Sequence, residues 1–422
     1  MARKMKDSGI EWIGEIPEGW RTINPKALFT QRKDKAQKGE RQLTSSQQYG
    51  ILYQDDYMEL TGSKVVTVEK DFDILKHVEA GDFVISMRSF QGGLEYSTKS
   101  GAISSAYIML VPNLELVYPR FYRWLLKSSV YIDALQRTTN MVRDGQAMRY
   151  SNFAQVRLFT LPLDEQKSRA DFLDLECSSI DKILFKTCSS IEEYKKLKQA
   201  VITQAVTKGV RGEREMKDSG VEWIGEIPAE WKIQRFARVA EVKSNLVSPD
   251  NYLEYPQISP ENIEKDSGKL LLPCRTVSEV GVISGNHLFY KGQILYSKIR
   301  PKLNKVCIAP FDGLCSADMY PIESKNDTRY IVYCILSNGF LQQVSMITEN
   351  RVKMPKVNQV ELSKILVAIP ETIAEQKEIA DCLDAKCAEI DRLIAKKEQL
   401  VKELESYKKS LIYEVVTGKR EV

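Results

Sequence analysis

The sequence predicts an α+β protein: two mixed α/β domains separated by a long antiparallel two-helix coiled coil, in a pseudo-two-fold internal repeat. Three observations predict it. Met5–Pro17 recurs as Met216–Pro228, with only Ile10 replaced, by Val221. Each half ends in a long heptad pattern, and 422 residues exceed what one hydrophobic core normally supports. A chain of two like halves commonly meets a partner that is itself bipartite.

The repeat sets the expected order of the domains. We expect a first globular domain over 1–162 and a long helix over 163–209. A second domain over 210–370 and a second long helix over 371–422 follow. The segments between the shared motifs are hard to align, so the two halves share a scaffold and differ in the domains that it carries.

Each variable region contains strand and helix patterns. Short β-branched and aromatic runs, each preceded by glycine, predict strands at 83–87 and 293–297. Apolar patterns that follow them predict helices over 121–135 and 330–344. This combination is typical of a mixed α/β domain.

Both long segments carry a largely apolar seam whose positions are alternately four and three residues apart, which favours a coiled coil. The seam positions are Ile180, Leu184, Thr187, Ile191, Tyr194, Lys198, Val201 and Ala205, then Ile390, Ile394, Lys397, Val401, Leu404, Lys408, Leu411 and Val415. Thr372 followed by Glu375 fits a capping box, and Asp164 can cap the first helix. Gly209 and Gly418 suit the helix ends. The alternative is two helices that each pack only on their own domain.

The short connection between the halves predicts the direction of the second helix. The linker from Lys208 to Met216 reaches at most ~25 Å, whereas a helix of roughly 43 residues is ~65 Å long. The second domain must therefore lie near the far end of the first helix, and the second helix can pair with the first only by running back.

Composition limits the function without identifying it. Sixty-one basic and 57 acidic residues leave a net charge of +4, so a nucleic-acid surface would have to be a local basic patch. The eight cysteines form no CxxC pair, and only His77 and His287 could assist them, which disfavours zinc. No run resembles a signal peptide or a membrane span. We expect a cytoplasmic protein with reduced cysteines and no membrane contact.

The sequence offers no catalytic motif. It has no P-loop, no GxSxG elbow, no HExxH helix and no Asn/Asp-Pro-Pro-aromatic motif of the kind an adenine methyltransferase uses. We expect no catalytic residue, no metal site and no cofactor in this chain.

Groups suited to reading DNA follow the predicted strand in each half and also precede each long helix. Arg and Lys can bind guanine edges, Gln and Asn can bind adenine edges, and lysines also neutralise phosphates. The candidate DNA-binding residues are Arg88, Gln91, Gly92, Arg143, Gln146, Arg149, Lys298, Arg300, Lys302, Asn304, Lys305, Asn350, Arg351 and Lys353. A solvated surface charge is the alternative for each of them.

The duplicated order of these motifs resembles the specificity (S) subunits of Type I restriction–modification enzymes, the HsdS family. The resemblance covers nearly the whole chain. It is carried by Trp12–Pro17 and Trp223–Pro228, by Trp20 and Trp231, and by Pro162 with Glu165-Gln166 and Pro370 with Glu375-Gln376.

The resemblance implies two target-recognition domains that each read one half of a bipartite, asymmetric DNA site. It implies that the helices fix the half-site spacing and dock two methyltransferase (M) subunits, and that endonuclease/translocase (R) subunits join them. Those partners would use S-adenosylmethionine, ATP and Mg, and this chain would be non-catalytic. A stand-alone two-headed DNA-binding regulator and a coiled-coil scaffold without a DNA role are the alternatives.

Overall fold

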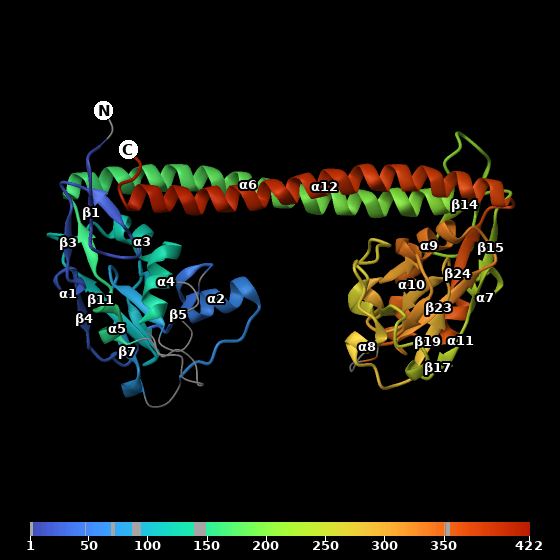
Figure 1. Cartoon of the computed structure of the whole chain (residues 1–422), viewed down its shortest axis with the longest axis horizontal. Helices are drawn as coiled ribbons and strands as arrows, with labels where there is room; N and C mark the ends of the chain where they lie inside the picture. Colours follow the sequence, from blue (N-terminus) through green and yellow to red (C-terminus); the bar gives the residue numbers. More distant parts are fainter. Residues whose placement is uncertain are drawn as a thin grey trace. The chain divides into compact units, whose positions relative to one another are not determined.

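Two long helices, α6 (Leu163–Lys208) and α12 (Ile373–Val416), are shared between the two units of the chain. Unit 1 comprises Met1–Thr187 and Gln399–Val422, and unit 2 comprises Cys188–Glu398. The computed structural model (Figure 1) describes residues 3–46, 48–68, 72–86, 94–138, 149–349, 351 and 355–422.

Unit 1 is built on an antiparallel sheet in the order β4-β11-β8-β9. Its strands are β1 (Met5–Asp7), β2 (Glu15–Pro17), β3 (Arg21–Ile23), β4 (Phe29–Arg32), β5 (Leu43–Ser46), β6 (Gly50–Tyr53), β7 (Lys76–Val78), β8 (Phe83–Ser86), β9 (Leu94–Tyr96), β10 (Gly101–Ile103), β11 (Tyr107–Pro112) and β12 (Leu158–Thr160). Its short helices are α1 (Pro25–Leu28), α2 (Gln54–Thr61), η1 (Phe72–Ile74), α3 (Pro119–Lys127), α4 (Ser129–Arg137) and α5 (Tyr150–Phe153). Aromatic side chains, with Phe29 in edge contact with Phe83, Tyr122 and Phe153, fill the core beside the sheet.

Unit 2 contains two four-stranded sheets, in the orders β16-β23-β20-β21 and β17-β19-β22-β18. Its strands are β13 (Met216–Asp218), β14 (Glu226–Pro228), β15 (Lys232–Arg235), β16 (Ala240–Val242), β17 (Leu246–Val247), β18 (Gln257–Ile258), β19 (Asn286–Phe289), β20 (Ile294–Ser297), β21 (Val306–Ile308), β22 (Gly313–Cys315), β23 (Met319–Ser324) and β24 (Leu366–Ile369). Its short helices are α7 (Phe236–Val239), η2 (Pro249–Asn251), η3 (Pro260–Asn262), α8 (Val277–Val280), η4 (Pro301–Leu303), α9 (Thr328–Leu336), α10 (Asn338–Thr348) and α11 (Gln359–Lys364). Both units therefore mix helices with strands, as the sequence predicted.

The segment that is written twice folds the same way in both units. Strand β1 pairs with β2 so that Met5 faces Pro17, and β13 pairs with β14 so that Met216 faces Pro228. The strands predicted at 83–87 and 293–297 are confirmed as β8 and β20, which are each paired with a central strand of a four-stranded sheet. Equal local sequence thus gives equal local register.

The helix predicted over 121–135 is two helices, α3 and α4, and the one predicted over 330–344 is α9 and α10. The break falls at Ser128 in unit 1 and at Ser337 in unit 2, and both have extended backbone. Each serine Oγ donates to a carbonyl three residues earlier, at 2.7 Å. A serine hydroxyl that binds a backbone carbonyl in this way competes with the helical hydrogen bonds, so one helix ends and the next begins at the serine. An apolar pattern does not reveal such a break.

In unit 1 the first part of α6 packs antiparallel on the last part of α12. Arg169 Nη1 donates to the Val415 carbonyl at 2.8 Å, and further along α6 Asp181 accepts from Lys408 Nζ at 2.6 Å. The buried core of the unit includes Leu173 of α6 and Leu411 of α12. The two helix segments therefore belong to the same core as the sheet.

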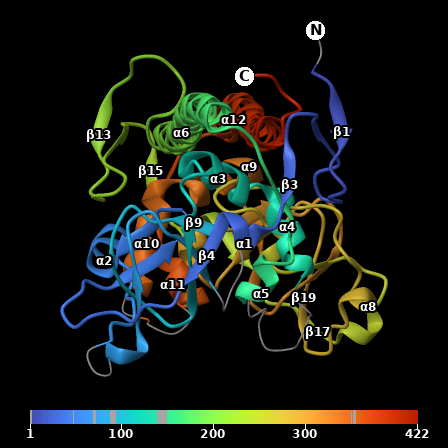
Figure 2. The same cartoon turned by 90° about the vertical axis from the view of Figure 1, so that its left-hand side faces the viewer.

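The same arrangement occurs in unit 2 between the last part of α6 and the first part of α12. Lys198 Nζ donates to Asp391 Oδ1 at 2.8 Å. Ile202 of α6 and Leu383 of α12 are buried in the core of the unit. Figure 2 shows α6 and α12 end-on, side by side. Predicted seam positions are buried or half-buried in many turns of both helices, whereas the continuity of the pair as one coiled coil stays a prediction.

The helix ends follow the predicted signals with one exception. Thr372 Oγ1 accepts from the backbone N–H of Glu375 at 3.2 Å, which is half of the predicted capping box. Gly209 and Gly418 follow the helices with φ of 76° and 78°, as helix-ending glycines do. Asp164 is not a cap, because α6 begins at Leu163 and Asp164 lies within its first turn.

Among the described residues no single helix is long and apolar enough to cross a membrane. The bent pair α9 and α10 passes that test only jointly, by length and composition. Both helices contribute buried residues to the core of unit 2.

Candidate nucleic-acid interface

The basic segment that follows β20 leaves a fully buried strand and turns at once to the surface of unit 2. All four residues of β20 are buried, and Lys298, the next residue, is half-buried. Lys298 Nζ lies 5.1 Å from the centre of the Tyr320 ring, a distance that gives a cation–π interaction. The lysine forms no ion pair with a described residue, so its charge is available to a ligand.

The turn after Lys298 has an unusual backbone. Arg300 and Asn304 flank η4 with φ of 46° and 42°, in the left-handed region that non-glycine residues rarely adopt. A hydrogen bond of 2.8 Å from the Arg300 N–H to the Pro355 carbonyl holds the first of them. This backbone turns the side chains of Arg300 and Lys302 to the solvent, where both are exposed.

Two of the predicted side chains in this turn are largely turned away from the solvent. Asn304 is 2% exposed, and its Nδ2 has no hydrogen-bond partner in the part of the chain that the structure describes. Lys305 is half-buried, and its Nζ donates to the Pro260 carbonyl at 2.6 Å. Their contact with DNA stays a prediction, but in this conformation neither side chain is presented freely to a partner.

The segment before α11 lies directly beside this turn. Ile299 and Lys356 form an antiparallel bridge, and the Val357 N–H donates to the Lys298 carbonyl at 2.9 Å. The structure thus places beside this turn the segment that directly follows the second predicted group, about fifty positions away in the sequence. Lys356 is exposed beside Arg300, which enlarges the basic patch of unit 2.

Arg351 stabilises this segment. Its guanidinium forms an ion pair with Glu361 of α11 and also donates to the Lys356 carbonyl. The hydrogen bond from Arg351 lowers the pKa of the Glu361 carboxyl, and the same bond raises the pKa of the arginine. The carboxylate is therefore neutralised by its own arginine rather than by Lys298.

A pocket of about 760 Å³ opens beside these residues in unit 2. It is lined by Ser244, Leu246, His287, Lys298, Ala317, Tyr320, Asn358, Gln359, Val360, Glu361 and Lys364. Burial, and then the charge of Lys298, lower the pKa of His287, which keeps its imidazole neutral at pH 7. Gln359 Nε2 donates to Ser244 Oγ at 2.5 Å. The pocket thus combines cationic and amide groups with a neutral imidazole.

Sequence reasoning missed His287, Ser244 and Gln359. No other ligand-type residue is near His287 in the sequence, which favours a structural interpretation. Ser244 and Gln359 come from segments more than a hundred positions apart and belong to no motif. Of these, only Gln359 offered a signal, because it lies within a few residues of the predicted group around Arg351.

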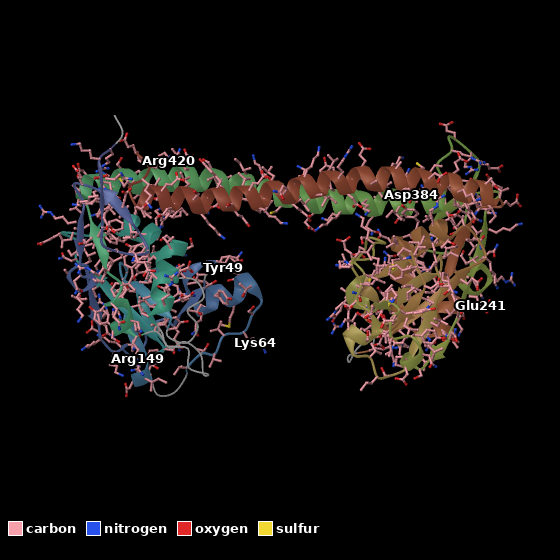
Figure 3. All side chains as sticks on the ribbon, viewed as in Figure 1. Tyr49, Lys64, Arg149, Glu241, Asp384 and Arg420 are labelled. Atoms are coloured by element: carbon pink, nitrogen blue, oxygen red, sulfur yellow. The ribbon has the colours of Figure 1, made fainter. Side chains whose placement is uncertain are left out.

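In unit 1 the described part of the predicted site is Arg149. It is exposed, its N–H donates to Asn152 Oδ1 at 3.0 Å, and it lies in the part of the unit remote from α6 (Figure 3). Seven predicted residues of the two units lie outside the described part of the chain: Arg88, Gln91, Gly92, Arg143, Gln146, Asn350 and Lys353. These predictions remain open.

The described residues hold no group of three or more His, Cys, Asp or Glu side chains arranged to bind a metal ion. The candidate surface is instead made of cationic, amide and hydroxyl groups, which suit hydrogen bonding to phosphates and base edges.

Comparisons with known proteins agree with this chemistry. Residues 228–404 match the model of the Type I restriction modification DNA specificity domain. The chain is 33% identical over 326 residues to the EcoDI specificity subunit of Escherichia coli, covering 73% of this chain and 69% of that protein. It is 23% identical over 360 residues to the MjaVIII specificity subunit of Methanocaldococcus jannaschii, and the match covers 81% of this chain and 80% of that protein.

A solved structure shows the same fold. The solved structure is described as the structural basis of complex assembly and conformational transition of the type I R-M system. One of its chains aligns with this chain with a TM-score of 0.69 at 11% sequence identity. The alignment covers 96% of this chain and 99% of that one. Together with the relationship to the E. coli protein, these findings show that the chain belongs to the family of type I restriction enzyme specificity subunits.

Proposed function

We propose that this chain is the DNA-recognition subunit of a type I restriction–modification enzyme. Membership of the specificity-subunit family carries the proposal. The basic surface of unit 2 supports it. On this surface lie Lys298, Arg300 and Lys356, which form no ion pair with a carboxylate among the described residues. The regulator and scaffold alternatives are not favoured, because the relatives are named as subunits of restriction enzymes.

In this proposal the chain carries no catalytic group and directs enzymes that do. Methyltransferase subunits would methylate adenine with S-adenosylmethionine, and endonuclease/translocase subunits would cleave DNA with ATP and Mg. Two methyltransferase subunits would fit two similar halves, since a repeated surface can bind a repeated partner.

We further propose that the globular domains over 1–162 and 210–370 each read one half-site and that the helices over 163–209 and 371–422 set the distance between them. The antiparallel ion pairs Asp181–Lys408 in unit 1 and Lys198–Asp391 in unit 2 support paired helices. Unlike domains on one continuous two-helix spacer would read unlike half-sites at a fixed separation.

Methylation mapping tests the function directly. Cells that express the chain with its methyltransferase partner should gain methylation at one bipartite, asymmetric sequence. Exchange of 18–160 for the same segment of a relative should change one half-site only. Insertion of one heptad in each long helix should change the gap and leave both half-sites intact. Methylation without a sequence preference would contradict the proposed function, and an unchanged gap would contradict the spacer.

A further inference from the structure

The pocket beside α11 differs from the rest of the basic surface of unit 2, and its chemistry goes beyond attraction to phosphates. Its walls come from β17, β19, the turn after β20, β23 and α11. Figure 1 shows β17, β19 and α11 in the part of unit 2 remote from α12. In a subunit that recognises DNA, such a surface can hold the residues that determine sequence preference.

The charge of the pocket is positive. Lys298 and Lys364 line it and form no ion pair with a described residue. Glu361 also lines it, but Arg351 binds its carboxylate. A pocket that keeps two free ammonium groups and neutralises its own carboxylate suits a polyanion.

His287 supplies an independent sign of a missing partner. The residue is 6% exposed, lines the pocket, and its Nδ1 has no hydrogen-bond partner among the described residues. Buried polar atoms are almost always paired, because an unpaired one loses its hydration without compensation. The unpaired Nδ1 belongs to a residue that lines the pocket, which favours a site that binds a ligand.

The first turn of α11 presents the groups that distinguish bases. Gln359 Nε2 donates a hydrogen bond to Ser244 Oγ, and Gln359 is exposed at the pocket. A glutamine amide can pair with adenine, and a lysine can bind the acceptors of guanine. Val360, next to Gln359, is an apolar side chain with 65% exposure, which suits contact with a thymine methyl group.

We propose that the pocket and the first turn of α11 form the surface of unit 2 that reads base edges of duplex DNA, through Gln359 and Lys298; this rests on the proposed function. Arg300 and Lys356, which are exposed outside the pocket, bind phosphates and position the duplex without reading it. The division assigns sequence preference to a residue of α11 that no sequence motif marks.

The experiment uses the complex of the full chain with its methyltransferase partner and duplexes substituted at each position of both half-sites. Gln359→Ala and Lys298→Ala should each reduce discrimination at one or two positions of one half-site by about 5- to 150-fold, the loss expected for one bidentate base contact. Discrimination at the other half-site should not change.

Arg300→Ala and Lys356→Ala are the matched controls. Each should weaken binding to all duplexes alike and reduce the slope of log affinity against log salt by about one. Gln359→Glu is a second test, because a carboxylate accepts hydrogen bonds from cytosine but donates none, so the preferred base should change rather than disappear.

Three results separate the hypotheses. Unchanged discrimination in the Gln359 and Lys298 variants, with a wild-type complex that discriminates, would overturn the base-reading surface and leave the proposed function intact. A uniform loss of affinity in those variants would reassign both residues to phosphate contact and also overturn it. A wild-type complex without any sequence preference would overturn the proposed function itself.

Discussion

Both units fix a long helix by the same tryptophan–glutamate contact but surround it differently. Trp20 Nε1 donates to Glu165 at 3.1 Å in unit 1, and Trp231 Nε1 donates to Glu375 at 3.2 Å in unit 2. In unit 1 the glutamate is also bound by Arg3 and by Arg169, and the side chain of Arg169 is buried. In unit 2 its further partners are arginines near the surface. The repeat therefore preserves the tryptophan–glutamate contact but not the residues around it.

The grooves beside the long helices differ in the same way. Asp181 in unit 1 pairs with Lys408 and keeps a side chain that is 55% exposed. Asp391 in unit 2 pairs with Lys198 and also with Lys269 of a loop, and its side chain is 22% exposed. Unit 2 therefore covers with its own loop a position that unit 1 leaves open. Variable segments, rather than the shared scaffold, create this difference.

Removal of the central glutamate should give the largest contrast between the units. Glu165→Ala leaves the guanidinium of Arg169 buried without a carboxylate, which should cost about 3–5 kcal/mol in the free energy of unfolding. Glu375→Ala should cost about 1.5–3 kcal/mol, because Arg214 is closer to solvent. Hydrogen exchange of peptides from each unit measures the two losses separately. Equal losses would show that burial of Arg169 does not distinguish the units.

Acid should weaken unit 1 through the same glutamate. Burial acts to raise the pKa of Glu165, but hydrogen bonds from Arg3, Arg169 and Trp20 outweigh it and lower the pKa from 4.5 to about 2. A carboxyl with a lowered folded-state pKa stabilises the protein above its unfolded value, and this stability is lost as pH falls from about 4.5 to about 2. Hydrogen exchange of unit 1 across this range should show a shallower pH dependence in Glu165→Gln. The same slope in both proteins would contradict the assignment.

The two lysine–aspartate pairs along the helices should differ in strength. Lys198 is 9% exposed in its pair with Asp391, whereas Lys408 is 24% exposed in its pair with Asp181. Lys198→Ala should cost about 1.5–3 kcal/mol, because it leaves a largely buried carboxylate with one partner fewer. Lys408→Ala should cost about 0.2–1 kcal/mol. Double-mutant cycles with Asp391→Asn and Asp181→Asn measure each coupling, and a larger coupling at the exposed pair would reverse the ranking.

The smallest effect is expected from the covering loop of unit 2. Lys269 Nζ lies 2.7 Å from Asp391 Oδ2, and the lysine side chain is 54% exposed. Lys269→Ala should cost about 0.2–1 kcal/mol, and the cost should decrease in high salt because the pair is screened. Unfolding at two salt concentrations measures this, with Lys265→Ala on the same loop as the control. A larger loss that salt does not reduce would mean that the loop packs on the helix rather than pairing with it.

The local patterns of the sequence predicted the elements well. The heptads gave two long helices, the short runs preceded by glycine gave β8 and β20, and the glycines after the helices have the expected left-handed backbone. A Cβ at Gly418 would lie 2.5 Å from Pro17 Cγ, so close packing on Trp20 also requires glycine there. The breaks at Ser128 and Ser337 were missed, since a serine inside an apolar pattern carries no periodic signal.

The candidate site was predictable only in part. The sequence indicated the turn after β20 as a candidate because basic residues cluster within one short segment. Which of these side chains are exposed was not predictable, because Asn304 is buried and Lys305 binds a carbonyl of the neighbouring η3. His287 and Ser244 enter the site from distant segments, and a single sequence contains no record of that proximity.

The sequence by itself determined the repeated scaffold, the long helices and the family, because these depend on short-range periodicity and on motifs that stay recognisable when neighbouring segments change. Only the tertiary structure decided which charges are paired inside the protein and which remain for a ligand. The physical reason is that a side chain's availability depends on the burial and the hydrogen-bond partners that folding brings from elsewhere in the chain. The pairing of Arg351 with Glu361, which leaves Lys298 free beside Gln359, exists only in the folded unit.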